Sequence, residues 1–160
     1  MDNLLNKEPV KRAQEYLKKF DENKKIKVLE ETARTAQDAS KALKCEVGAI
    51  VKSLLFRAGD GFILCLVSGD KKCSLNKLKK ITQKNDLCMA TPDEVKTQTG
   101  YTIGGVSPVG LINKIEIFMD SSLKRFNKLY AAAGHPNCIF EINFKELNTI
   151  TSSKIMEITE

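Results

Sequence analysis

The chain has 160 residues and 42% hydrophobic content, which suits one compact domain spanning residues 1–160 and argues against wholesale disorder. No apolar run approaches the roughly 18–20 residues of a membrane span, and residues 1–20 are too charged for a signal peptide, so we expect a cytoplasmic protein with no membrane partner. The net charge of +6 is compatible with phosphate binding, whereas the absence of Trp disfavours a surface of many stacked aromatic rings.

The N-terminal segment is predicted to be mainly helical. Residues 7–20 are typical of a helix, because Pro9 is tolerated in a first turn. One apolar stripe at helical spacing contains Val10, Ala13, Tyr16 and Leu17. A short strand is expected at residues 25–30. Thr35 then fits the N-cap of a second helix that stops near Gly48.

Two β-rich runs form the strongest hairpin signal in the chain. Residues 50–57 and 62–68 are separated by a loop that contains Asp60 and Gly61. Both runs are apolar on both faces, so we expect central, covered strands.

A lysine-rich helix is predicted next. Residues 71–85 carry six lysines and no acidic residue. The inward positions are expected to be Leu75, Leu78 and Ile81, and the solvent-facing ones Lys77, Lys80 and Lys84. Such a face is either a footprint for a nucleic-acid backbone or an ordinary solvated helix surface, and the pattern alone leaves both open.

The C-terminal half alternates between strands, short helices and one irregular segment. Thr91 is typical of another helix start, with proline and acids following it. Residues 99–110 hold four glycines and a proline, which excludes regular structure there. The remaining elements are expected as strands at 115–120, 127–132, 138–142 and 154–158 and a helical turn at 144–147. This order predicts an α+β fold with a mixed, barrel-like sheet surrounded by short helices.

Two features are candidates for chemistry. The segment from Gly104 to Pro108 can bend sharply and present backbone N–H groups to an anion or a developing oxyanion, although such a segment taken alone is more often a structural turn. Lys52 stands within an apolar strand, so its ammonium either reaches past its neighbours to solvent or meets an anion in a pocket.

Other kinds of catalytic site are disfavoured. The five cysteines have no CxxC spacing and His135 is the single histidine, so neither a metal site nor a redox motif is expected. Ser53, Thr102 and Ser107 are nucleophiles by type, but none lies in a GxSxG motif and a triad would have to use His135. Asp120, at a strand end, is expected to hydrogen-bond the glycine segment in a structural role.

Several short motifs occur in a fixed order along the chain. They are Thr35-Ala36, Lys52-Ser53-Leu54, Ser68-Gly69-Asp70, Thr99-Gly100-Tyr101, Gly104-Gly105-Val106-Ser107-Pro108-Val109-Gly110, Met119-Asp120 and Ala133-Gly134. From about residue 25 to the C-terminus, this order resembles the YbaK family, which also supplies the editing insertion domain of bacterial prolyl-tRNA synthetases.

The resemblance implies hydrolysis of the ester that joins a mischarged amino acid to the 3′ end of tRNA, without metal or cofactor. It implies that Lys52 helps to hold the terminal adenosine and its phosphate, and that Gly104 and Gly105 present backbone groups to the reacting ester. The amino-acid pocket implied by the resemblance contains Thr35, Ala36, Val106, Ser107, Pro108 and Gly134. No catalytic role is carried to His135.

A second pocket of this kind has a physical rationale. A synthetase pocket gains only about 1–3 kcal/mol per methylene, so it does not reject every smaller amino acid, and a hydrolytic site supplies the missing discrimination. The sequence therefore predicts a trans-editing hydrolase for mischarged tRNA, with tRNA(Pro) carrying a small non-cognate amino acid as the expected substrate. Lys77, Lys80 and Lys84 are expected to guide the acceptor end, and prolyl-tRNA synthetase is an expected partner. The alternative is a non-catalytic module that binds aminoacyl-tRNA or a synthetase.

Overall fold

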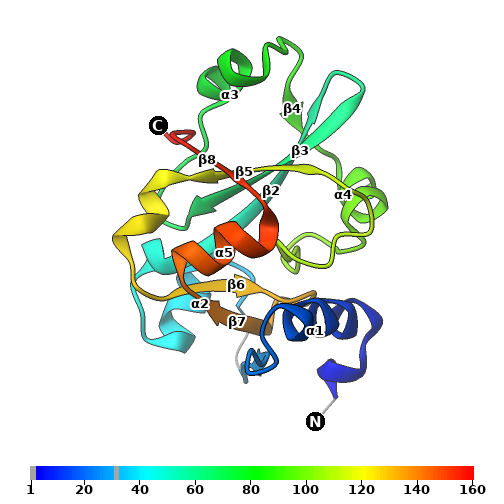
Figure 1. Cartoon of the computed structure of the whole chain (residues 1–160), viewed down its shortest axis with the longest axis vertical. Helices are drawn as coiled ribbons and strands as arrows, with labels where there is room; N and C mark the ends of the chain where they lie inside the picture. Colours follow the sequence, from blue (N-terminus) through cyan, green and yellow to red (C-terminus); the bar gives the residue numbers. More distant parts are fainter. Residues whose placement is uncertain (1–2, 31–32) are drawn as a thin grey trace.

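The computed structural model describes residues 3–30 and 33–160, where one mixed sheet of eight strands is flanked by five α-helices (Figure 1). The strands are β1 (Lys27–Val28), β2 (Ile50–Ala58), β3 (Gly61–Ser68), β4 (Cys88–Met89), β5 (Glu116–Asp120), β6 (Leu129–Ala132), β7 (Cys138–Ile142) and β8 (Lys154–Met156). The helices are α1 (Glu8–Phe20), α2 (Ala36–Leu43), α3 (Leu75–Thr82), α4 (Pro92–Thr99) and α5 (Phe144–Thr151), and 3-10 turns lie at Leu4–Asn6, Val47–Ala49 and Ser121–Arg125. The predicted α+β class is confirmed.

The sheet has the order β1-β7-β6-β2-β3-β5-β8, with β4 paired to β2. The predicted hairpin is present: β2 and β3 are antiparallel, with Val51 opposite Ser68 and Ala58 opposite Gly61. Parallel pairing joins β2 to β6, β3 to β5 and β5 to β8, which makes the sheet mixed. The hairpin therefore occupies the middle of the sheet, as its apolar faces predict.

The main core lies on the concave side of the sheet, against α1. Val10, Ala13 and Leu17 of α1 are fully buried there. Ile117 of β5 and Phe140 of β7 belong to the same core although their strands lie far apart in the strand order. The sheet must curve around this core for both side chains to reach it, which gives the predicted barrel-like shape. The barrel is open, because no pairing among the described residues joins β1 to β8.

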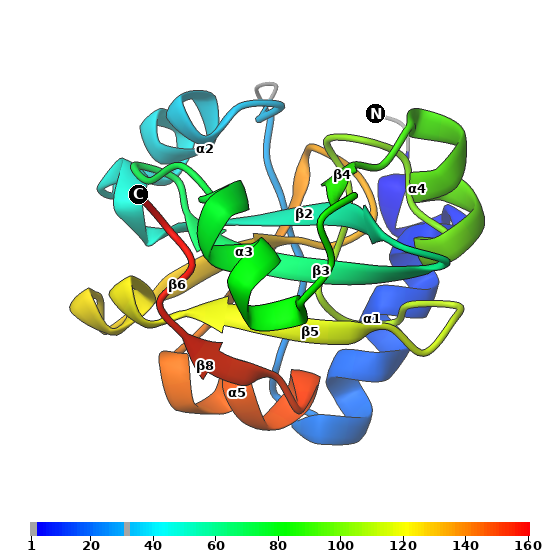
Figure 2. The ribbon, with the colours of Figure 1, turned by 90° about the horizontal axis from the view of Figure 1, so that it is seen from above.

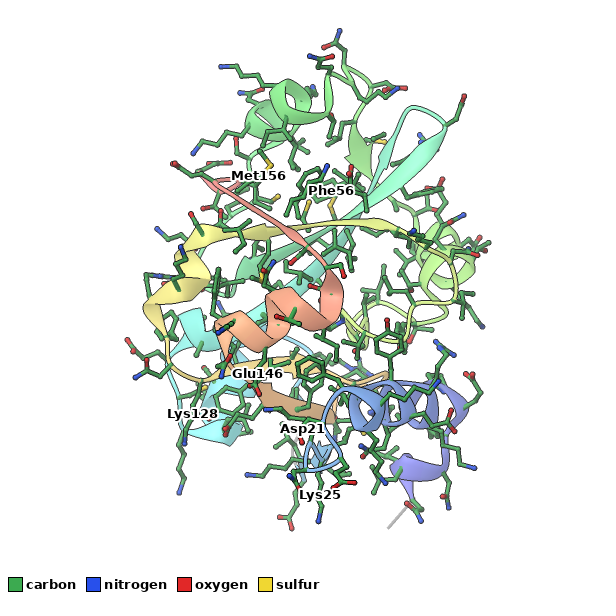
Figure 3. The ribbon with its side chains drawn as sticks, in the orientation of Figure 1. Asp21, Lys25, Phe56, Lys128, Glu146 and Met156 are labelled. Carbon is green, nitrogen blue, oxygen red and sulfur yellow. The ribbon has the colours of Figure 1, made fainter. Side chains whose placement is uncertain are left out.

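A second apolar layer covers the opposite side of the central strands. Leu78 of α3 is fully buried against a cluster that includes Phe56, Cys65 and Phe118, with Met156 packed at its margin. Figure 2 shows α3 in front of β3 and β5, and Figure 3 shows Phe56 and Met156 close together below that helix. The central strands are thus covered on both faces.

Local capping signals set several helix starts as predicted. Thr35 Oγ1 accepts a hydrogen bond of 3.1 Å from the amide of Asp38, so α2 begins at the expected residue. Thr91 and Glu94 form a reciprocal capping box at the start of α4. Helix α1 covers nearly all of the predicted range 7–20.

Several boundaries and side-chain directions differ from expectation. Helix α2 ends at Lys44 in the left-handed conformation rather than near Gly48, and α5 extends four residues beyond Leu147, to Thr151. Tyr16 and Leu75 are 45% and 40% exposed, because each lies at the margin of its helix's apolar stripe rather than over the core. Strand β4 was missed because two residues give no periodicity.

Candidate functional site

A cavity of about 430 Å³ lies beside β2, and we call it the Lys52 cavity. Its lining residues are Ala33, Arg34, Thr35, Ala36, Gln37, Ala39, Ile50, Val51, Lys52, Ser53, Leu54, Leu55, Gly69, Met89, Ala90, Val95, Ile103, Gly104, Val106, Ala132 and Ile139. The start of α2, the middle of β2 and the glycine segment therefore share one hollow. Most of its walls are apolar, with a few polar groups among them, which is typical of a small-molecule site.

The start of α2 forms one wall. Thr35 is exposed and Ala36 half-buried at the first turn. The turn comes close to the sheet because residue 69 is glycine: a Cβ there would stand 2.8 Å from the Cβ of Ala36 and 2.4 Å from the carbonyl oxygen of Val47. Gly69 thus permits a helix N-terminus, whose free N–H groups favour negative charge, to line the cavity.

Lys52 supplies a cation at this wall. Its Nζ donates a hydrogen bond of 2.7 Å to the main-chain oxygen of Lys71. Burial lowers the pKa of the Lys52 ammonium, and the nearby Cys73 and Asp70 partly oppose that shift. An ammonium has three donors, and the bond to Lys71 is the one that Lys52 makes among residues 3–30 and 33–160, which leaves two N–H groups for a ligand there.

The loop that holds Lys52 is itself fixed by an ion pair. Arg125 donates two hydrogen bonds, of 3.0 and 2.7 Å, to the carboxylate of Asp70, and a third of 2.9 Å to Ser68 Oγ. The bonds from Arg125 hold the pKa of Asp70 below its usual range. This fork restrains the turn whose Lys71 carbonyl orients Lys52.

The glycine segment forms the opposite wall. Gly104 is exposed and has a φ of +93°, which a side chain rarely adopts. Gly105 accepts a hydrogen bond of 3.0 Å at its carbonyl from the amide of Gly134. A Cβ on Gly105 would lie 2.9 Å from the backbone nitrogen of His135, so the two chain segments meet backbone to backbone.

Helix α1 secures both ends of the glycine segment. Arg12 Nε donates to the Gly110 oxygen at 2.7 Å, and Arg12 Nη2 donates to the Gly100 oxygen at 2.9 Å. The same guanidinium lies 4.6 Å from the ring centre of Tyr101, whose hydroxyl donates to the Val109 oxygen at 2.6 Å. One helix side chain and one buried ring therefore hold the loop's two ends together.

The structure brings five of the predicted residues together and separates the others. Thr35, Ala36, Lys52, Gly104 and Val106 line the Lys52 cavity. By contrast, Gly105 and Gly134 pack backbone against backbone, and Gly134 also abuts the start of α1. Ser107 is fully buried, with its hydroxyl oxygen accepting a bond from Val109, and Pro108 lines a second cavity of about 620 Å³ on the far side of the loop.

The three lysines predicted to face solvent differ from one another. Lys80 and Lys84 are exposed. Lys77 Nζ donates to the main-chain oxygen of Thr159 at 2.7 Å and pairs with Glu157 at 3.1 Å, so it is tied to the C-terminal segment. Lys77 therefore reaches solvent, as expected, but its ammonium is engaged by the C-terminal segment.

Asp120 does not reach the glycine segment. Its carboxylate accepts bonds from the amides of Ile158 at 2.8 Å and Ser122 at 3.1 Å, and from the hydroxyl of Thr159 at 3.2 Å. The expected bond to the glycine loop is therefore wrong, because the C-terminal segment crosses the end of β5 instead. The predicted structural role of Asp120 holds.

Sequence reasoning missed part of the cavity. Arg34 is an exposed second cation at its rim, and the exposed Met89 and Ile103 lie at its mouth. Arg34 and Ile103 lie in loops next to predicted motifs, which could have pointed to them, whereas Met89 lies in β4 and gives no such signal. His135 lies outside the lining, half-buried, and burial together with Lys7 and Arg34 lowers its imidazole pKa.

Within the described part of the chain, no group of three or more His, Cys, Asp or Glu side chains is arranged to hold a metal ion. All five cysteines are free thiols. No helix among residues 3–30 and 33–160 is long and apolar enough to cross a membrane.

The fold and the cavity define a small α+β domain that pairs a half-buried lysine with a glycine loop across one pocket. Residues 30–150 match the family described as the aminoacyl-tRNA editing domain, and the chain belongs to that family.

The most informative relatives are of two kinds. YwhH of Bacillus subtilis (strain 168), an uncharacterized protein, is 34% identical over 147 residues, covering 91% of this chain and 93% of YwhH. The proline–tRNA ligase of Kosmotoga olearia is 40% identical over 91 residues, which are 57% of this chain but 16% of that ligase. The chain is therefore similar to nearly all of one small protein and to a short part of a synthetase.

A solved structure described as a candidate trans-editing enzyme for prolyl-tRNA synthetase superposes with a TM-score of 0.91. It is 35% identical, and the match covers 96% of this chain and 98% of that one. The mixed sheet and its helices are thus shared over nearly the whole length of both chains.

Proposed function

We propose that this protein is a trans-editing hydrolase that deacylates mischarged tRNA, with tRNA(Pro) bearing a small non-cognate amino acid as its substrate. One observation carries the proposal: Lys52, the start of α2 and Gly104 line a single cavity of about 430 Å³. Membership of the aminoacyl-tRNA editing family and the similarity to a segment of proline–tRNA ligases support the substrate class.

The cavity offers a division of roles for the two parts of such a substrate. The cations Lys52 and Arg34 stand at the wall where a terminal nucleotide phosphate would be neutralised. The apolar residues Val95 and Val106 also line the cavity, and the proposal places the small side chain of the substrate against them. An aminoacyl ester enters with its adenosine at the basic wall and its amino acid between these valines.

The reaction is the attack of water on the ester carbonyl, which releases the amino acid and the 3′ or 2′ hydroxyl of the terminal ribose. The ester is already activated, so orientation and a few N–H donors on the developing oxyanion supply much of the acceleration. Gly104, with its positive φ and no side chain, lets the loop backbone approach the carbonyl. We propose that neither a metal ion nor a cofactor takes part.

The test is deacylation of tRNA(Pro) charged separately with Ala, Cys, Ser, Thr and Pro, in buffer containing a chelator. We expect release of one or two small amino acids while prolyl-tRNA is spared. Lys52→Ala should lower kcat/KM at least 10-fold, because a hydrogen bond to a charged group is worth about 1.5–3 kcal/mol. Lys72→Ala is the matched control, since this nearby lysine is exposed and lies outside the cavity.

Each contrary outcome has a distinct meaning. Binding of the charged tRNA without release would favour a non-catalytic module that holds aminoacyl-tRNA or a synthetase. Release that stops when the chelator is added would overturn the metal-free mechanism. Rapid hydrolysis of tRNAs other than tRNA(Pro) would replace the substrate assignment, and a pull-down with prolyl-tRNA synthetase tests the expected partnership.

A further inference from the structure

One edge of β2 is open in the middle of the strand. On this edge β6 pairs only with Ile50 and Val51, and β4 pairs only with Phe56 and Arg57. Among residues 3–30 and 33–160, no strand meets β2 between these two pairings. We call the interval from Lys52 to Leu55 the β2 gap, and all four of its residues line the Lys52 cavity.

The main chain of Ser53 points into this gap. In an antiparallel pair, successive residues direct their N–H and C=O alternately toward the partner strand and away from it. The carbonyl of Ile50 accepts from Gly69 on the β3 side, whereas the carbonyl of Leu55 accepts from Ala90 on the β4 side. Ser53 is two residues from Leu55, so its N–H and C=O also face away from β3, on the side where no strand of the described residues pairs with it.

The side chain of Ser53 adds a third polar group. Its Oγ is buried and has no hydrogen-bond partner among the described residues. A buried hydroxyl without a partner costs about 1–3 kcal/mol, and a ligand that hydrogen-bonds to it would remove that cost. Rotation about χ1 moves such an oxygen between three staggered positions, which lets it turn toward an occupant of the gap.

We propose that the aminoacyl group of the substrate occupies the β2 gap as a one-residue strand. Its α-ammonium donates to the main-chain oxygen and to Oγ of Ser53, and its ester carbonyl accepts from the Ser53 N–H. This is the pairing that a neighbouring strand would make, supplied by a single amino acid. The inference rests on the proposed function for its substrate class and adds how the amino-acid end is recognised.

The surroundings of Ser53 agree with this assignment. On a strand, side chains alternate between faces, so the ammonium of Lys52 lies on the other face, where the Lys71 oxygen holds it. The substrate's ammonium therefore approaches two acceptors without meeting that cation. The neighbours Leu55, Ala90 and Val95 are buried apolar residues that would enclose a short side chain.

Two uncleavable probes test the assignment independently of turnover. They are 3′-deoxy-3′-(L-alanylamino)adenosine and its propionyl counterpart, which differ only in the α-amino group. By calorimetry, we expect the wild-type protein to bind the alanyl probe about 10- to 100-fold more tightly, as a charged hydrogen bond predicts. Ser53→Ala should weaken the alanyl probe about 10-fold and leave the propionyl probe unchanged, and Ser53→Thr should restore binding of the alanyl probe.

A structural role for Ser53 would give different results. Because the described part of the chain offers Oγ no hydrogen-bond partner, Ser53→Ala should unfold at the same or a higher urea concentration than the wild type. Ser40→Ala is the matched control: its buried hydroxyl donates to Gln37 and lies outside the cavity, so it should lose stability and keep probe selectivity. Equal binding of both probes, equal losses in Ser53→Ala or no binding of either probe would overturn the inference. Preserved probe selectivity without ester hydrolysis would instead overturn the proposed function alone.

Discussion

The contact between the glycine segment and the β6–β7 turn can be tested by adding one methyl group. In Gly105→Ala the new Cβ would stand 2.9 Å from the His135 nitrogen and 3.0 Å from the Gly134 carbonyl carbon. Both are main-chain atoms, so neither can move aside as the end of a flexible side chain can. The loop and the turn must separate, which strains the Gly134-to-Gly105 hydrogen bond of 3.0 Å.

The expected magnitude follows from two opposing effects. Overpacking of this kind costs about 1–3 kcal/mol, whereas replacing glycine by alanine stabilises by about 0.4–1 kcal/mol through the unfolded chain. The net loss should be about 1–2 kcal/mol. Gly61→Ala is the matched control, because a Cβ there meets only the Ala58 oxygen at 3.8 Å, so it should be neutral or slightly stabilising.

Urea unfolding followed by far-ultraviolet circular dichroism measures both variants, and kcat/KM for deacylation reports the position of the loop. We expect Gly105→Ala to lose stability and activity together, since Gly104 and Val106 on either side of it line the cavity. If Gly105→Ala were as stable and as active as Gly61→Ala, the backbone contact would not position the loop, and the reasoning would be refuted.

Three further changes address the supports of the site. Arg12→Lys keeps the positive charge but cannot hydrogen-bond both ends of the glycine segment. We expect it to lower the free energy of unfolding in urea by about 1–2 kcal/mol and to lower kcat/KM. Wild-type values of both would show that Arg12 does not hold the two ends together. Burial raises the pKa of Tyr101 to about 12, above its ordinary 10.0. The contribution of the protonated phenol to the free energy of unfolding is therefore complete below pH 10.0 and is lost as the pH rises toward 12. The stability gap between wild type and Tyr101→Phe should therefore narrow by about 2–3 kcal/mol over that range, and a constant gap in alkaline urea titrations would contradict this. Lys77→Ala should lower the free energy of unfolding by about 1 kcal/mol, because it loses the bond to a part-buried carbonyl. Lys80 is exposed, so Lys80→Ala should change that free energy by no more than about 0.5 kcal/mol while it flattens the salt dependence of KM. Equal unfolding midpoints of the two variants would contradict this difference.

The elements that the sequence predicts well are those whose signals are local. Thr35 and Thr91 cap their helices through atoms three residues away, and the β2–β3 hairpin closes over two turn residues. Such contacts depend on the order of a few neighbouring side chains, so they can be read without knowing the rest of the fold. Helix ends at Lys44 and Ser152 were harder, because both are non-glycine residues in the left-handed conformation.

The site could be predicted only in part, because its supports are distant in sequence. An ammonium within an apolar strand makes Lys52 a candidate for chemistry. Its bond to the Lys71 oxygen, however, depends on the path of the chain after β3, which the sequence around Lys52 does not indicate. Gly134 was assigned to the amino-acid pocket by resemblance, whereas it approaches the start of α1, more than a hundred residues earlier. No local sequence pattern indicates either of these contacts between distant segments.

The folded unit also exceeds the part of the chain that the family match covers. The match begins at residue 30, yet Val10 and Leu17 of α1 are fully buried in the main core and Arg12 holds both ends of the glycine segment. Removing α1 would expose that core and release the loop that forms one wall of the Lys52 cavity. In this chain the helix that precedes the matched residues therefore takes part in shaping the cavity, and the folded unit includes α1 as well as the residues of the family match.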